Sequence, residues 1–199
     1  MPKILAGYHD AKLVIAGKGG MIDELRAQAD YLGLGDKVYF AGYMNGKDVE
    51  KMYKAADISV FPSTYEPFGI VALEGMLAER PIVVSDAGGL GEIVEHRETG
   101  MKSYCGNPNS IADSILELLY NPELCANIVK KAKSKVKNNY NWAKIAQDTH
   151  FTYQKAICET MAERQRLQDV QEKAKKTKKI PGETEITNLL TFRKRQAYA

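Results

Sequence analysis

The sequence predicts an α/β fold built on a doubly wound parallel sheet. Four short apolar runs end in a glycine, a proline or a Ser-Asp pair, at residues 13–16, 38–41, 58–61 and 82–85. Runs that are apolar at most positions are typical of strands buried on both faces. Segments with helical spacing of apolar residues lie between them, at 21–34, 47–56 and 69–79. This alternation predicts βαβ units, so we expect the four strands to lie side by side and parallel.

The second half of the chain is predicted to be mostly helical. Pro108 and Pro122, each beside an asparagine, are typical of helix starts. Another helix begins near Trp142 and runs past Tyr153. Residues 159–180 lose apolar residues and gain charge, as in a solvated helix or a frayed tail. The sequence therefore predicts a domain over 1–158 and a charged helical or disordered tail over 159–199.

Charge and composition limit the classes of partner. The formal net charge is +3, but 10 of the 28 Lys and Arg residues and only 6 of the 25 Asp and Glu residues lie in 159–199. The first 158 residues are close to neutral, so we expect no nucleic-acid partner. No apolar run approaches the roughly 20 residues that span a membrane, and no signal peptide is visible. The three cysteines have no metal-ligand spacing. These features predict a cytoplasmic protein with reduced thiols and without membrane association.

A ligand is expected at one edge of the sheet. In doubly wound sheets, ligands bind at the carboxyl ends of the strands. The loops at those ends are residues 17–20, 42–46, 62–68 and 85–91. The first loop, Gly17-Lys18-Gly19-Gly20, lacks the third glycine of a dinucleotide-binding fingerprint, because position 22 is isoleucine. We therefore do not expect an NAD site.

Glu74 is the most informative residue of the predicted helix 69–79. At about 100° per residue, Glu74 falls within the arc of the apolar residues Ile70, Val71, Leu73, Leu77 and Ala78. A carboxylate on a buried face is costly unless it is hydrogen-bonded or paired. Glu74 therefore either forms a structural salt bridge, caps a backbone group or contacts a ligand, and its place within two turns of a strand-loop-helix start favours a ligand. We expect Glu74 to be buried and Glu66, in the loop, to be more exposed.

The start of the same helix favours an anion. Free backbone N–H groups and the helix dipole attract phosphate at a helix N-terminus, and Gly69 has no side chain to block it. Glu66 lies just before this position, where a carboxylate suits hydroxyl groups better than phosphate. Together these residues predict a ligand with hydroxyls at both ends and phosphate between them, which is the layout of a nucleotide-sugar.

The segment Glu66-Pro-Phe-Gly-Ile-Val-Ala-Leu-Glu74 resembles the paired-glutamate signature of retaining glycosyltransferases with the GT-B fold. This group 1 family contains glycogen synthases, sucrose synthases and mannosyltransferases. Similar residues occur at 16–19, 40–42, 55–63 and 88–94, and the resemblance covers about residues 1–155. It implies the C-terminal, donor-binding, Rossmann-like half of a GT-B fold. The family's first strand, with its Arg and Lys, and its N-terminal acceptor domain are expected to be absent. Gly75 stands where the family mostly has alanine.

The resemblance also implies roles for individual residues. Glu66 would be the catalytic residue near the transferred sugar, and Glu74 would bind the ribose. The remaining donor-binding residues would be Phe68, Gly69, Ile70 and Val71 for the sugar and diphosphate, Gly42, Tyr43 and Met44 for the base, and Gly17, Lys18 and Gly19 for the cleft. No bound metal and no cofactor are expected. The substrate would be a UDP-, ADP- or GDP-sugar.

Three functions remain open from the sequence. The first is a hexosyltransferase whose donor domain passes a sugar to a glucan or glycoconjugate, with this chain inactive on its own. The second is a non-catalytic nucleotide-sugar-binding or assembly module, with the acceptor domain on another chain. The third is a fragment similar to a nucleotide-sugar epimerase, against which the paired glutamates weigh.

Overall fold

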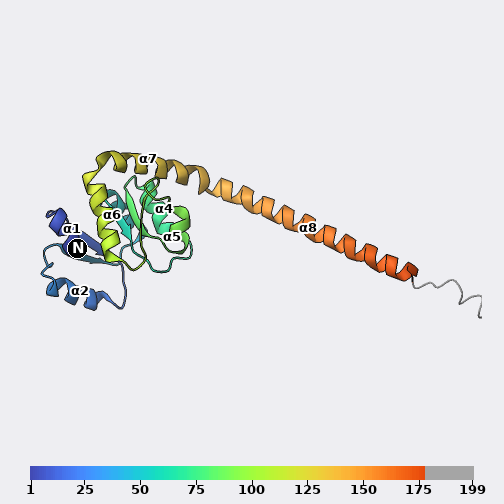
Figure 1. Ribbon diagram of the computed structural model, residues 1–199, viewed down its shortest axis with the longest axis horizontal. Coiled ribbons are helices and arrows are strands. Elements are labelled where there is room, and N and C mark those ends of the chain that lie inside the picture. The colour runs from blue at the N-terminus through green and yellow to red at the C-terminus, as the bar shows by residue number, and fades with distance from the viewer. Residues whose placement is uncertain (178–199) are drawn as a thin grey trace, which may run out of the picture. The chain divides into compact units, whose positions relative to one another are not determined.

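The computed structural model describes residues 1–177. The chain divides into two compact units, residues 1–141 and a part that begins at Trp142. In the first unit parallel strands alternate with helices, which confirms the predicted α/β fold class (Figure 1). The predicted tail lies partly in the second unit, and its residues 178–199 lie outside the described residues.

The strands in residues 1–177 pair only in parallel. β1 pairs with β2, while β4 lies between β3 and β5. Four of the strands are those that the apolar runs predicted. Their bounds are Leu13–Ala16 for β1, Val38–Gly42 for β2, Ser59–Phe61 for β3, Ile82–Ser85 for β4 and Met101–Ser103 for β5.

The prediction that four strands lie side by side is wrong at one point. Within the described residues, no strand pairing joins the β1–β2 pair to the β3–β4–β5 sheet. The β1–β2 pair is also open on one face, where Val14 is 42% and Tyr39 67% exposed. Of the predicted strands, only β4 is buried at every position. The apolar runs located the strands but not their burial, because burial depends on elements that pack against them from elsewhere in the fold.

The helices of the first unit connect and cover the strands. The predicted starts at Pro108 and Pro122 are confirmed, and each has an asparagine N-cap. Asn107 accepts from the backbone of Asn109 and Ser110, and Asn121 accepts from that of Leu124. The helices are α1 Pro2–Gly7, α2 Ile22–Tyr31, α3 Gly46–Ala55, α4 Ile70–Leu77, α5 Gly88–Ile93, α6 Pro108–Tyr120 and α7 Pro122–Asn139.

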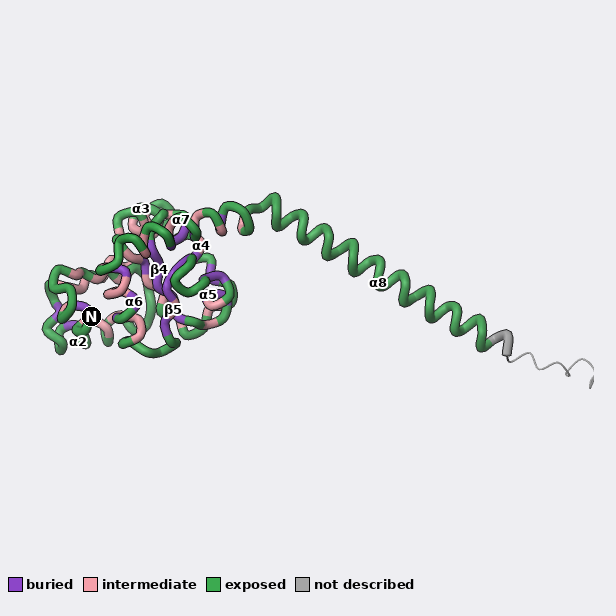
Figure 2. Tube along the Cα trace, turned by 45° about the horizontal axis from the view of Figure 1, so that its top comes forward, coloured by how far each residue is buried: buried purple, intermediate pink, exposed green. Residues whose placement is uncertain are grey.

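The core lies on both faces of the β3–β4–β5 sheet (Figure 2). Side chains alternate along β4, so Ile82 and Val84 face one side and Val83 the other. The first side packs against α4, α5 and the later part of α7, and the second against α6 and the earlier part of α7. The helices α1 and α6 pack together, as do α3 and α4. These helix contacts link the segments on either side of the β1–β2 pair, α1 and α3, to the rest of the unit.

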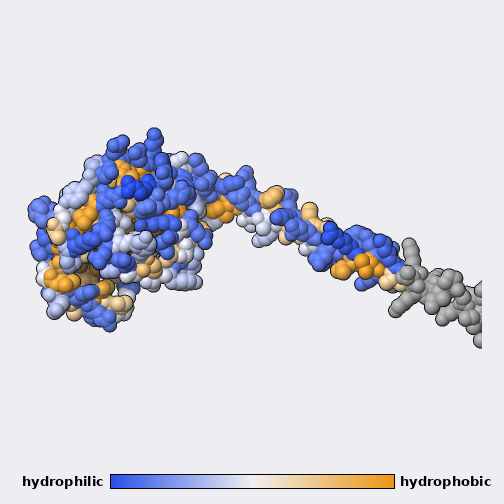
Figure 3. All heavy atoms as spheres, in the orientation of Figure 1, coloured by the Kyte–Doolittle hydropathy of each residue, from blue (hydrophilic) through white to orange (hydrophobic). Residues whose placement is uncertain are grey.

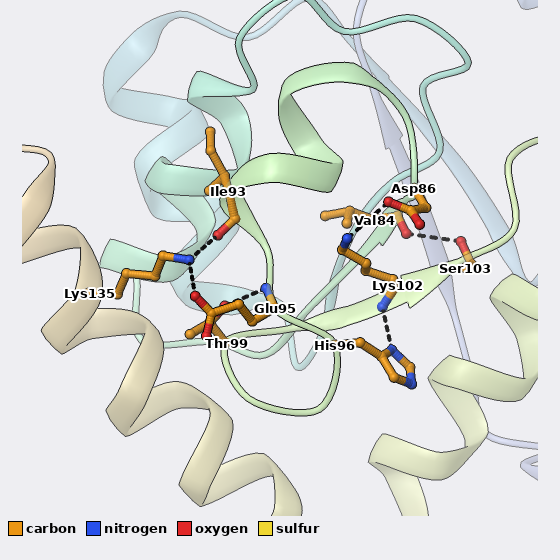
Figure 4. Close-up of polar contacts among 9 residues, drawn as sticks. All are labelled: Val84, Asp86, Ile93, Glu95, His96, Thr99, Lys102, Ser103 and Lys135. Carbon is orange, nitrogen blue, oxygen red and sulfur yellow. Dashed lines mark hydrogen bonds and ion pairs between the residues drawn. The ribbon is translucent and has the colours of Figure 1, made fainter.

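Polar contacts fix α5 and the edge of the sheet (Figure 4). The Lys135 ammonium on α7 donates to the Ile93 carbonyl at 2.8 Å and to the Glu95 carboxylate at 2.6 Å. This hydrogen bond and the positive charge lower the pKa of Glu95. The Lys102 backbone N–H donates to His96 Nδ1 at 3.0 Å. These contacts hold the end of α5 and the segment that follows it against α7 and β5.

The second unit is described by one helix, α8, from Trp142 to Thr177. The predicted helix past Tyr153 is thus confirmed, and it continues through the first part of the charged stretch. Every side chain described in α8 is exposed, including large apolar ones (Figure 3). Those more than half exposed are Trp142, Phe151, Tyr153, Ile157, Met161, Leu167 and Val170. No helix in residues 1–177 is long and apolar enough to cross a membrane.

The two sheets should differ in local stability. We expect the backbone amides of Ile15 and Phe40 to exchange with solvent deuterons at least about tenfold faster than those of Val83 and Val84, because β1 and β2 are covered on one face only. Amide exchange followed by NMR measures this directly. Equal protection in the two sheets would contradict the packing described above.

Candidate functional site

The predicted site residues lie in loops at the carboxyl ends of the strands. The loop after β1 holds Gly17, Lys18 and Gly19, and the loop after β2 holds Tyr43 and Met44. The loop after β3 holds Glu66 and Phe68 and leads into α4 with Glu74. The structure brings these residues together in two groups rather than one.

The first group joins the ends of β1 and β2. The Gly17 N–H donates to the Gly42 carbonyl at 2.7 Å. The Lys18 ammonium lies 4.9 Å from the centroid of the Tyr43 ring, a cation–π contact. Both side chains are exposed, and so is Gly19, while Met44 is half-buried. This group offers a positive charge and an aromatic face to solvent at the carboxyl edge.

The second group depends on a backbone contact between two loops. The Gly89 N–H at the start of α5 donates to the Glu66 carbonyl at 2.8 Å. A Cβ on Gly88 or Gly89 would overlap the carbonyl oxygen of Glu66 or Phe68, so a side chain is excluded at both positions. Gly88 also has a positive φ of 48°. These two glycines allow the β3–α4 loop to press against α5.

The Glu66 carboxylate occupies the start of α4. Its Oε1 accepts from the Gly69 N–H at 3.1 Å, and Gly69 is the N-cap of the helix with a φ of 94°. Glu66 therefore partners a donor group that the sequence analysis assigned to an anion. A ligand that takes this N–H has to displace the carboxylate. Glu66 is half-buried, so the expectation that it is the more exposed of the pair is wrong.

Glu74 lies on the open side of α4, not on the buried side. Ile70 and Leu77, on the same face, are 58% and 48% exposed. The buried side is formed by Ala72, Gly75 and Met76 against the sheet. The expected burial of Glu74 is thus wrong, because α4 is apolar almost all round and its pattern did not decide the buried face. Small residues decide it, since they let the helix approach the strands.

Tyr53 and Lys102 adjoin the predicted site residues but were not predicted from the sequence. The Tyr53 hydroxyl on α3 donates to Glu74 Oε2 at 3.4 Å. The Lys102 ammonium, on β5, pairs with Asp86 Oδ1 at 3.0 Å at the carboxyl edge (Figure 4). The helical spacing of 47–56 marked Tyr53 as a core residue, and no sequence pattern linked it to Glu74, 21 positions away. Lys102 lies in β5, a strand that the apolar runs did not predict.

The two groups are not joined to each other. Within residues 1–177, no hydrogen bond or ion pair connects the Gly17–Met44 group with Glu66, Phe68 or Glu74. In the same part of the chain, no cluster of three or more His, Cys, Asp or Glu side chains is placed to hold a metal ion. The site thus presents one cation–aromatic group and one carboxylate–backbone group along the strand ends.

Comparison with known proteins assigns this arrangement to a family. The family model described as glycosyl transferases group 1 matches residues 1–135. The chain belongs to this family. The predicted resemblance is therefore confirmed, and the strand-end loops are those of a group 1 glycosyltransferase domain.

Solved structures share this fold, and one of them is a domain of a group 1 glycosyltransferase. The C-terminal domain of a group 1 glycosyltransferase from Francisella tularensis matches with a TM-score of 0.64 and 27% identity, over 70% of this chain and 74% of that one. Anabaena HepE, solved with UDP, matches with a TM-score of 0.68 and 26% identity, over 78% of this chain and 45% of HepE. HepE was also solved with UDP-glucose.

The match to one curated relative covers less than half of that protein. A glycosyltransferase of Methanocaldococcus jannaschii, itself uncharacterized, is 48% identical over 157 residues. The match covers 79% of this chain but 40% of that protein. This chain thus spans well under half the length of the relative.

The glycine contact between the two loops should be essential for stability. We expect Gly89→Ala to destabilise the first unit by about 2–4 kcal/mol, because the new Cβ would overlap the rigid backbone of Phe68. Gly35→Ala is the matched control, since a Cβ there has open space around it. Denaturant unfolding of both variants tests this. Equal loss of stability in the two would show that the loops move apart at little cost.

Proposed function

We propose that this chain is the donor-binding domain of a retaining glycosyltransferase that takes a nucleoside-diphosphate sugar. The placement of Glu66 and Glu74 around the start of α4, at the carboxyl end of a parallel strand, is the main support. HepE, which shares this fold, was solved with UDP and with UDP-glucose. A sugar nucleotide suits these strand ends because its diphosphate can use helix N–H groups and its hydroxyls can donate to carboxylates.

The residues of the site then contact different parts of the donor. Glu74 accepts hydrogen bonds from the ribose hydroxyls, and Glu66 approaches the transferred sugar once the ligand has displaced it from Gly69. The backbone of Phe68, Gly69, Ile70 and Val71 faces the sugar and diphosphate. Gly42, Tyr43 and Met44 lie against the base, and Gly17, Lys18 and Gly19 line the donor side. The base is uracil, adenine or guanine, and the acceptor is a glucan or glycoconjugate.

The absence of pairing between the two sheets of the described residues supports the proposal that this domain works as part of a larger enzyme. In the described residues β1 pairs only with β2, and β3 only with β4, although α1–α6 and α3–α4 contacts hold the two sheets in one unit. A further parallel strand between β1 and β3 would join them, as would be expected of the family's first strand. The acceptor domain is then a separate body, preceding this one or supplied by another chain. If it is never supplied, the same site serves a binding or assembly module without catalysis.

Donor binding is tested by calorimetry with UDP, GDP and ADP and with their glucose and mannose derivatives. We expect one nucleotide series to bind and the others to bind at least about tenfold more weakly, because base contacts discriminate by about 1.4 kcal/mol or more. A chain that is folded by circular dichroism and binds none of these compounds contradicts the proposal.

The two glutamates should respond differently to neutralisation. We expect Glu74→Gln to weaken binding of the free nucleoside diphosphate by about ten- to a hundredfold, since charge-assisted hydrogen bonds are worth about 1.5–3 kcal/mol. Glu66→Gln should leave that binding nearly unchanged and weaken only the nucleotide-sugar, because its partner is the sugar. If Glu74 only bridges α3 and α4, its variant will melt at a lower temperature and still bind nucleotide normally.

The chain by itself should not transfer sugar. In a two-domain transferase the reaction takes place between the domains, which exclude water and position the acceptor. We expect no product from the purified chain with the donor that it binds and simple sugars or glucans. A radiolabelled-donor assay measures this, and turnover above the buffer rate would overturn the expectation.

A further inference from the structure

Tyr53 and Gly75 adjoin Glu74, and neither is among the residues proposed to contact the donor. Tyr53 lies on α3, half-buried, with its hydroxyl 3.4 Å from Glu74 Oε2. Among the described contacts this hydroxyl is the one partner of the Glu74 carboxylate. The distance is long for an O–H···O bond.

A contact with Phe61 sets the position of the Tyr53 ring. This ring meets the Phe61 ring edge-on, with centroids 6.0 Å apart and planes at 68°. Phe61, on β3, in turn lies against α4 at Gly75. A Cβ on Gly75 would be 3.3 Å from the Phe61 ring and 3.0 Å from Ile82 Cγ2, tighter than most real contacts. Because Gly75 has no side chain, Phe61 can lie close to α4 and support Tyr53 beside Glu74.

We infer that Tyr53 is a positioning residue for Glu74, and that Gly75, through Phe61, sets where Tyr53 stands. The inference rests on the proposed function. An exposed glutamate samples several rotamers, and ordering it costs free energy on binding. With Tyr53 on one oxygen, the carboxylate is held over the open face of α4, and its other oxygen is left for a ribose hydroxyl.

The protonation state of Tyr53 fits this role. Burial, and then the negative charge and the hydrogen bond of Glu74, raise the pKa of Tyr53 to about 12. The raised pKa means that the folded protein favours the neutral phenol, which keeps its proton as pH rises through 10 and loses it only near 12. The hydroxyl is therefore a donor over the whole range in which nucleotide binding is measured.

The pair is tested first without any ligand. At pH 10.5 an ordinary tyrosine is about three-quarters ionised, whereas Tyr53 should be almost fully protonated. NMR of tyrosines labelled at Cζ, with Tyr53→Phe for assignment, reports this. In Glu74→Gln the ionised fraction of Tyr53 at the same pH should rise several-fold, because the negative charge is lost and the neutral amide oxygen is a weaker acceptor. No change in that variant, with the fold intact by circular dichroism, overturns the pairing.

Binding then tests the positioning role. Tyr53→Phe keeps the ring contact with Phe61 and should weaken UDP binding by about three- to tenfold, or binding of whichever diphosphate the wild type prefers. Tyr31→Phe, on α2 and 89% exposed, is the matched control and should bind as wild type. In the Glu74→Gln background, Tyr53→Phe should cause no further loss, since it acts through Glu74. Additive losses would mean that Tyr53 acts independently, and unchanged binding would overturn the role.

Gly75→Ala gives a second route to the same conclusion. The added methyl group pushes Phe61 and so moves Tyr53, and we expect weaker nucleotide binding together with a larger ionised fraction of Tyr53 at pH 10.5. Nucleotide binding and the ionised fraction of Tyr53 together distinguish a failure of the proposed function from a failure of the positioning role. If wild type binds no nucleotide but Tyr53 responds to Glu74→Gln, the proposed function fails and the pairing stands. If wild type binds nucleotide and Tyr53 does not respond, the positioning role fails alone.

Discussion

The contact between the β3–α4 loop and the start of α5 is the constraint on which the site depends. Gly89 donates to the Glu66 carbonyl, and neither Gly88 nor Gly89 has space for a side chain beside the Glu66 and Phe68 backbone. This contact sets the path of the loop, and so the direction in which α4 leaves it. Both glutamates are placed by that path, Glu66 on the Gly69 N–H and Glu74 on the open face. Alignment of these loops thus comes from backbone packing rather than from charge.

The sequence predicted where the strands and helices lie along the chain better than it predicted which elements pack beside them. Apolar runs located β1 to β4, and asparagine and proline located the starts of α6 and α7, because these signals act over a few residues. The break between the β1–β2 pair and the other sheet was not predictable from the runs, since a run does not say which strand lies beside it. The same limit applies to β1 and β2, whose open face is visible only in the fold.

The candidate site shows a similar division. Short stretches of sequence predicted the paired glutamates, the glycines at the strand ends and the family. The family is confirmed. The relative exposure of Glu66 and Glu74 was predicted the wrong way round. Helix α4 is apolar on nearly every side, and the small residues Ala72 and Gly75 decide which side faces the strands. Tyr53 was not recognised as a partner of Glu74, because their contact joins two helices and depends on Phe61 and Gly75 behind it.

Among the described residues β1 and β3 each leave one edge unpaired, which has a consequence for the behaviour of this domain in concentrated solution. An exposed strand edge is a template on which a foreign chain can add, and long flat edges seed fibrils. Here the two strands have four and three residues, and a register irregularity interrupts the β1–β2 ladder between Ile15 and Ala16. Edges this short accept only a few hydrogen bonds. Self-association through them should therefore be weak and reversible on dilution, and should give small clusters rather than ordered aggregates.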